Sequence, residues 1–173
     1  EEDVVGLYPN QAIEHFRDTI PGGVILISTR PDEEARFSAK LDAGAAFGMT
    51  QLLFSDHVLS FLRNLAEKTD YRPELLLSFG YVPKLETKKG LIRWLIQDES
   101  PVVKKEMERV AEIAELPFKQ KKATLVDHYR RVVEGAAELG FPVGVHLEFP
   151  YGPSKPAFET FAEMLEAWSP PEG

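Results

Sequence analysis

Four short runs of apolar residues have the length and composition of buried strands. Helical periodicity fills the stretches between these runs, and near-continuous apolar strands that alternate with helices predict a parallel sheet covered by helices. The predicted strands are Gly23–Ser28, Ala46–Phe54, Glu74–Val82 and Val143–Phe149.

The segments between these strands carry apolar residues at the spacing of amphipathic helices. Asp32–Leu41 is the first, and Val58–Leu65 is the second, with Ser55 or Asp56 as its expected N-cap. Gly140 is a good C-cap residue for the helix that precedes the fourth strand. The remaining helices are predicted at Thr87–Ile96, Pro101–Ala114, Leu125–Leu139 and Phe158–Leu165.

Four strand–helix units amount to half of an eight-fold barrel or to a short open sheet. A closed (β/α)₈ barrel typically needs about 250 residues, whereas this chain has 173. We therefore expect residues 1–173 to form a single α/β domain, a half or incomplete barrel of the TIM type, with a loose tail at residues 169–173.

Composition narrows the classes of function. The net charge is −8 with no basic stripe, which argues against nucleic acid as a partner. The absence of cysteine excludes disulfides, zinc–thiolate sites and thiol nucleophiles, and the histidine spacing does not suggest a metal. Without a signal peptide at the start of this sequence or an apolar run near the ~20 residues of a membrane helix, a cytoplasmic protein is expected.

The run Lys40–Phe54, KLDAGAAFGMTQLLF, is the most informative part of the chain. It combines a helix end, a glycine turn and an apolar strand from which Gln51 emerges. Ligands of parallel α/β folds bind at this end of the strands, so Gln51 is a candidate binding residue. The alternative is a glutamine that caps a helix or binds loop backbone.

The same run resembles the methylenetetrahydrofolate reductase family, flavin-dependent barrels that reduce a folate-bound one-carbon unit. Lys40, the turn Asp42–Ala45 and the pair Thr50–Gln51 match the family in order and spacing. Downstream, ELLLSFGYVP, LIRWL and GVHLEF resemble later family segments. The similarity covers roughly residues 22 to 166 and corresponds to the second half of the family barrel.

The resemblance implies a set of substrate-binding residues. Gln51 would hold a folate or pterin, Trp94 would stack on it, and His146 would lie near the top of the barrel, beside Glu148. Each has an alternative role, since a tryptophan among leucines is often core and His146 with Glu148 could simply satisfy each other. No catalytic residue is predicted, because the family's proton donor lies in the first half.

The resemblance also implies FAD as cofactor, with NADH or NADPH as reductant. Lys40 would contact a flavin phosphate and Glu33 a ribityl or ribose hydroxyl, with Thr29 as a third contact in a loop that departs from the family pattern. A lysine in the last turn of a helix also complements the helix dipole, which is the alternative for Lys40.

A second hypothesis is a non-catalytic half-barrel, or a pterin- or flavin-binding relative, that assembles with a partner chain or with itself. A bare half-barrel exposes strand edges and an apolar sheet face, which favours a homo-oligomer or a partner that completes the barrel.

Overall fold

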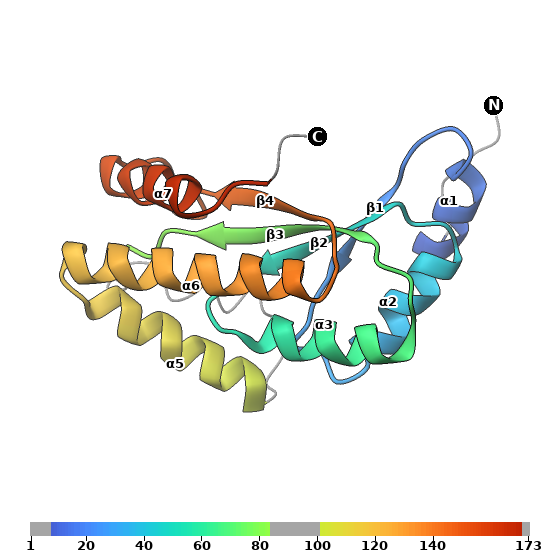
Figure 1. The fold of residues 1–173 in the computed structure, drawn as a ribbon, viewed down its shortest axis with the longest axis horizontal. Helices are drawn as coiled ribbons and strands as arrows, with labels where there is room; N and C mark the ends of the chain where they lie inside the picture. Colours follow the sequence, from blue (N-terminus) through green and yellow to red (C-terminus); the bar gives the residue numbers. More distant parts are fainter. Residues whose placement is uncertain (1–7, 84–100, 171–173) are drawn as a thin grey trace.

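The computed structural model describes residues 8–83 and 101–170, in which helices alternate with the strands of one sheet (Figure 1). All strand pairs are parallel and the order is β1-β2-β3-β4. The strands are β1 (Gly23–Leu26), β2 (Phe47–Leu52), β3 (Glu74–Gly80) and β4 (Val143–Glu148). The helices are α1 (Pro9–Phe16), α2 (Glu33–Asp42), α3 (His57–Lys68), α5 (Pro101–Glu115), α6 (Phe118–Glu138) and α7 (Lys155–Ala167).

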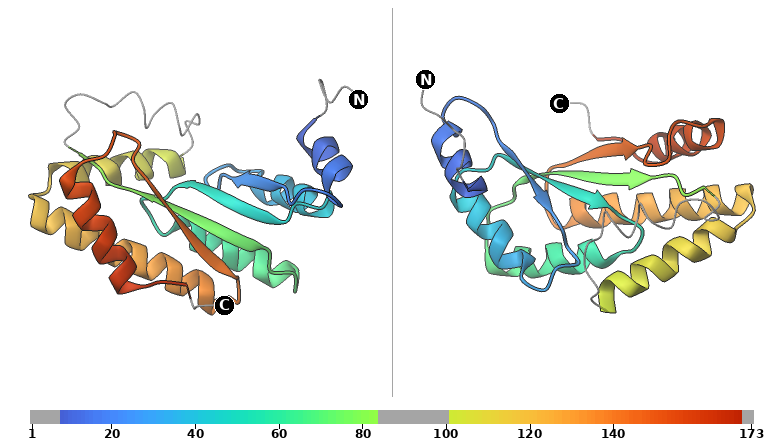
Figure 2. Two further views of the ribbon diagram at one scale, coloured as in Figure 1. Left: turned by 90° about the horizontal axis from the view of Figure 1, so that it is seen from above. Right: turned by 180° about the vertical axis from the view of Figure 1, so that it is seen from behind.

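The predicted α/β class and the four strands are confirmed, and each strand follows the one before it in space as in a barrel wall. Because all the strands run parallel, their four carboxyl ends lie at one edge of the sheet. Helices α3, α5 and α6 lie on one side of the sheet (Figures 1 and 2). The architecture is therefore that of a partial (β/α) barrel.

One face of the sheet forms the core with the helices. Phe37 of α2, Leu62 of α3 and Tyr129 of α6 are fully buried against strand residues such as Leu77. In the described part of the chain, no helix covers the opposite face, and the strands are visible from above in Figure 2. Ile25 is accordingly 48% exposed on that face.

Two helices end in the same glycine-based motif. At the end of α2, the Gly44 amide donates to Leu41 and the Ala45 amide to Lys40, with Gly44 at φ +103°. At the end of α6, Gly140 has φ +84°, its amide donates to Ala137, and the Phe141 amide donates to Ala136. Only glycine adopts this backbone conformation readily, so both predicted turns have a physical cause.

The prediction for α6 was wrong at its start, because this helix begins at Phe118 instead of Leu125. Within the added first turn of α6, the Lys121 side chain is buried and its Nζ donates to the Ala114 carbonyl at 2.9 Å. The lysine thereby binds the end of α5. Helix α1 was not predicted, and the predicted helix Thr87–Ile96 lies outside the described residues.

Candidate functional site

A β-bulge in β2 sets the direction of Gln51. Met49 pairs with Leu76 and Leu52 pairs with Ser78, so two residues of β2, Thr50 and Gln51, oppose one residue of β3. A bulge of this kind redirects side chains and is common beside active sites.

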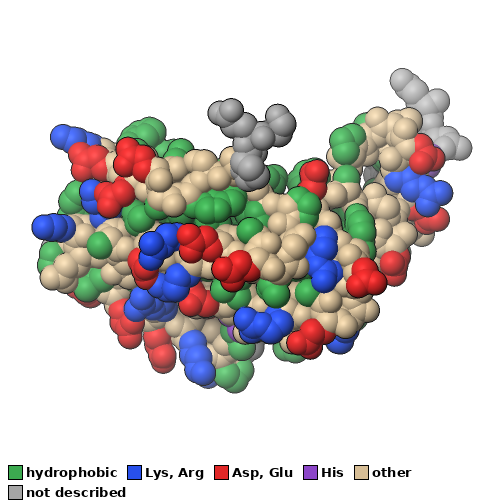
Figure 3. Space-filling view, viewed as in Figure 1, with side chains coloured by type: hydrophobic (Ala, Val, Ile, Leu, Met, Phe, Trp, Pro, Cys, Tyr) green, Lys and Arg blue, Asp and Glu red, His purple; other side chains and the backbone are tan. Residues whose placement is uncertain are grey.

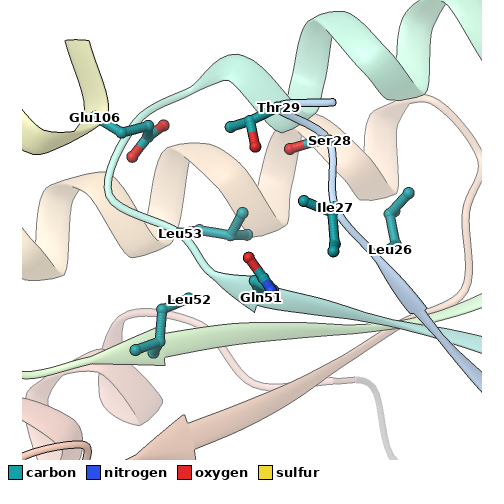
Figure 4. A pocket seen from close by; sticks show the side chains of 8 residues that line it. All are labelled: Leu26, Ile27, Ser28, Thr29, Gln51, Leu52, Leu53 and Glu106. Atoms are coloured by element: carbon teal, nitrogen blue, oxygen red, sulfur yellow. The ribbon is translucent and has the colours of Figure 1, made fainter. Parts of the chain in front are cut away.

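Gln51 lines a small cavity at the carboxyl ends of β1 and β2. The Gln51, Thr29 and Glu106 side chains point toward the same space (Figure 4). The cavity has a volume of about 20 Å³, which is enough for one water-sized group. Two predicted site residues, Gln51 and Thr29, are thus brought together although they lie far apart in the sequence. The complete lining is Leu26, Ile27, Ser28, Thr29, Gln51, Leu52, Leu53 and Glu106.

Glu106 of α5 is a site residue that sequence reasoning missed. It is 6% exposed, it accepts a hydrogen bond from the Ser55 hydroxyl, and burial raises the pKa of its carboxyl. A carboxyl inside an apolar helical repeat was the one available signal, because charged groups are seldom buried without a role.

The loop that follows Gln51 is held by α6. His128 contacts the Leu53 carbonyl at 3.2 Å through Nε2 and Asp56 at 3.1 Å through Nδ1. Hydrogen bonds from His128 and Arg131 lower the pKa of Asp56 to about 2. Asp56 is the N-cap residue of α3, as predicted for Ser55 or Asp56, but its carboxylate makes no capping hydrogen bond and instead ties the loop to α6. The Ser55 hydroxyl oxygen accepts a hydrogen bond from the His57 amide at 3.3 Å.

A polar chain crosses the sheet from β2 to β4. The Thr50 hydroxyl oxygen accepts a hydrogen bond from the Ser78 amide at 2.9 Å, and the Ser78 hydroxyl lies 3.3 Å from His146 Nδ1. Glu148 is 3.3 Å from the same nitrogen. His146 and Glu148 therefore share a face, as predicted, and His146 contacts Ser78 and Glu148 without lining the Gln51 cavity.

Lys40 and Glu33 lie against the outer edge of β1. Lys40 Nζ donates to the Ile25 carbonyl at 3.0 Å, and Glu33 accepts from the Ile27 amide at 3.0 Å. The Glu33 side chain is fully buried and lies 3.9 Å from Lys40. Their polar groups satisfy an unpaired strand edge, and neither residue lines the cavity at Gln51.

The remaining expectations concern the wider molecule. Trp94 lies outside the described residues. Within residues 8–83 and 101–170, no group of three or more acidic, histidine or cysteine residues could hold a metal, and no helix there is long and apolar enough to cross a membrane. On the face drawn in Figure 3, side chains of both charges are interspersed over α5 and α6.

The sheet order and the cavity at the carboxyl edge define a partial (β/α) barrel with a cavity at the end of the strands where barrel proteins bind their ligands. The chain belongs to the family of mycobacterial methylenetetrahydrofolate reductases, whose sequence profile matches residues 1–172. The resemblance seen in the sequence is thereby confirmed.

A solved structure has a similar fold. It is an uncharacterized protein from Clostridium thermocellum, described as binding two copies of 5-methyl-5,6,7,8-tetrahydrofolic acid, with a TM-score of 0.65 and 16% sequence identity. The match covers 93% of this chain but 58% of the other, so this chain spans little more than half the length of that protein. No curated protein sequence matches the chain.

Proposed function

We propose that this chain binds the pterin ring of a reduced folate and serves a methylenetetrahydrofolate reductase-like oxidoreductase that acts on a folate-bound one-carbon unit. The observation that carries the proposal is the Gln51 carboxamide, directed by the bulge into a cavity at the carboxyl ends of β1 and β2. A carboxamide donates and accepts hydrogen bonds at once, which suits the mixed edge of a pterin. Family membership and the folate-binding neighbour support the same ligand class.

The test of folate binding is calorimetric titration of the chain with 5-methyltetrahydrofolate. We expect saturable binding that Gln51→Ala weakens about tenfold, the size of one or two lost neutral hydrogen bonds. Gln120→Ala is the matched control, because Gln120 is exposed on α6, away from the cavity. An absence of saturable binding by the unmodified chain would overturn the proposal.

FAD is the proposed cofactor, and it would supply the hydride after reduction by NADH or NADPH. The contacts of the described residues do not gather its predicted ligands, since Lys40 and Glu33 bind the edge of β1 and only Thr29 lines the cavity.

The cofactor has its own test, visible absorption after incubation with excess FAD and desalting. Retained bands at roughly 370 and 450 nm, which belong to the flavin itself, would support the oxidoreductase. Lys40→Ala should then reduce retention, and Lys68→Ala should not, because Lys68 lies at the exposed end of α3 and pairs with Glu34. A colourless protein would overturn the proposal of FAD as cofactor and leave the proposal of folate binding in place.

A second candidate function is a half-barrel that assembles with a further copy or a partner chain. The uncovered sheet face favours it, because Ile25 is 48% exposed and a hollow of about 390 Å³ is lined by residues that include Phe47 and Leu76. Sedimentation velocity should show a species larger than a monomer, and Ile25→Asp should dissociate it. Ile20→Asp, at a still more exposed isoleucine outside the strands, should leave the mass unchanged.

A further inference from the structure

The Glu106 carboxyl belongs to the wall of the cavity that Gln51 also lines. It reaches the cavity from α5, far along the chain from Gln51, and it is 6% exposed. One oxygen accepts a hydrogen bond from the Ser55 hydroxyl, and a backbone hydrogen bond from Phe54 further anchors the carboxyl. These bonds hold the group in a defined orientation at the cavity wall.

The size of the cavity restricts what enters it. About 20 Å³ accommodates one water-sized group. A whole pteridine is far larger, but an exocyclic amino group or an exocyclic oxygen of a pteridine is about the size of a water molecule. The cavity therefore suits a single substituent at the rim of a ring that lies outside it.

The chemistry of the walls favours one substituent. An ionised Glu106 carboxylate only accepts hydrogen bonds, whereas the Gln51 carboxamide and the Thr29 hydroxyl can each donate or accept, so Glu106 decides which substituent is favoured. An amino group offers two hydrogens to this carboxylate. An exocyclic oxygen would meet the Glu106 carboxylate without a hydrogen between them and would be repelled.

We propose that Glu106 and Gln51 form a recognition pocket for the exocyclic amino group of a 2-amino-4-oxopyrimidine ring, the ring that distinguishes pterins from pteridine diones. This inference rests on the proposed folate function and adds Glu106 as a specificity-determining residue. A hydrogen bond to a charged acceptor is stronger than a neutral one, so the carboxylate dominates the discrimination.

The test compares pterin with lumazine, which carry an amino group and an oxygen, respectively, at the same ring position, lumazine having an added hydrogen on the adjacent ring nitrogen. Fluorescence titration of the chain should show a preference for pterin of about 10- to 100-fold. Glu106→Gln places an amide donor in the cavity. It should therefore lower the affinity for pterin, raise the affinity for lumazine, and narrow or reverse the preference between them. Glu112→Gln is the matched control, on the same helix with a side chain that is 67% exposed.

Each outcome separates this inference from the function on which it rests. Equal affinities for pterin and lumazine in a chain that binds 5-methyltetrahydrofolate would overturn the amino-group pocket alone. If Glu106→Gln lowered the affinity for both rings equally, the amino-group pocket would also be overturned, and the role of Glu106 would be to hold the loop that carries Ser55. Failure to bind either ring or 5-methyltetrahydrofolate would overturn the folate function as well. Should Glu106→Gln fail to fold, Glu106→Asp keeps the charge, withdraws it from the cavity and should likewise reduce the preference.

Discussion

The Thr50 hydroxyl oxygen accepts the backbone amide of Ser78 at 2.9 Å, and both residues are buried. Because β2 bulges at this position, a side chain takes the place of a backbone carbonyl in the ladder to β3. The hydrogen bond keeps the buried amide satisfied while the next residue, Gln51, lines the cavity.

Replacement of Thr50 by Val should lower the free energy of unfolding by about 1–3 kcal/mol, because the shape is kept but the buried Ser78 amide loses its acceptor. Folate affinity should fall with it, since the bulge positions Gln51. Urea denaturation measures the first effect and calorimetric titration the second. Thr50→Ser retains the acceptor and should preserve folate binding, and a Val variant as stable as the unmodified chain would contradict the role of this bond.

Gly48 allows β2 to approach α2 closely. A Cβ at this position would lie 2.8 Å from the ring of Phe37, which is fully buried. Gly48→Ala should therefore lower the free energy of unfolding by about 1–3 kcal/mol through overpacking. Gly22→Ala is the control, since its Cβ would meet only Ile13 at 3.9 Å, an ordinary contact. Equal urea midpoints for the two variants would show that α2 can move away from β2 without a loss of stability.

Asp56 should make stability depend on acid pH. Its pKa falls from 3.8 to about 2 in the folded protein, through hydrogen bonds from His128 and Arg131. A lowered folded-state pKa contributes stability above pH 3.8, and this contribution is lost as the pH falls toward about 2.

Asp56→Asn should therefore destabilise the protein by about 1 kcal/mol at neutral pH, a value reduced because the carboxylate is half exposed. The difference between the two proteins should vanish by about pH 2. Urea midpoints across this range measure it, with Asp18→Asn as a control at a side chain that is 90% exposed. A difference that does not change with pH would indicate lost packing instead of lost charge.

Folate affinity should fall on acidification, because the ionised Glu106 accepts the hydrogens of the ligand amino group. Burial raises the pKa of Glu106, and the charged or polar groups that face it are Ser55, Asp56 and His128. Protonation removes an acceptor, so affinity should be full above the Glu106 pKa and decline as the pH falls through it. Titrations with 5-methyltetrahydrofolate across this range should show a decline that Glu106→Gln abolishes. An unchanged pH profile in that variant would assign the titration to another group.

The strands and most of the helices could be predicted because their causes are local. Continuous apolar runs, helical spacing and the two glycines with positive φ, Gly44 and Gly140, act within a few residues of where they stand. The presence of Thr29 and Gln51 at one cavity could be partly predicted too, since the carboxyl ends of neighbouring parallel strands meet at one edge.

Glu106, Lys121 and His128 could not be placed in this way. Each was polar within a helical pattern, where the usual expectation is a solvated side chain. The burial of Glu106 and His128 depends on where α5 and α6 lie against the loop after β2, which places Glu106 beside Ser55 and His128 beside Asp56. Such contacts between residues more than fifty positions apart carry no local signal. The buried Lys121 instead donates to Ala114, near the end of the preceding helix.

By itself, the sequence determined the parallel α/β class, the family and the strand end at which Gln51 lies, because apolar periodicity and glycine turns are properties of short segments. Only the tertiary structure decided the bulge that directs Gln51, the engagement of Lys40 with β1 and the arrival of Glu106 at the cavity. The physical reason is that hydrogen-bond partners and burial are set by which elements pack together, and packing joins residues that are distant in the chain.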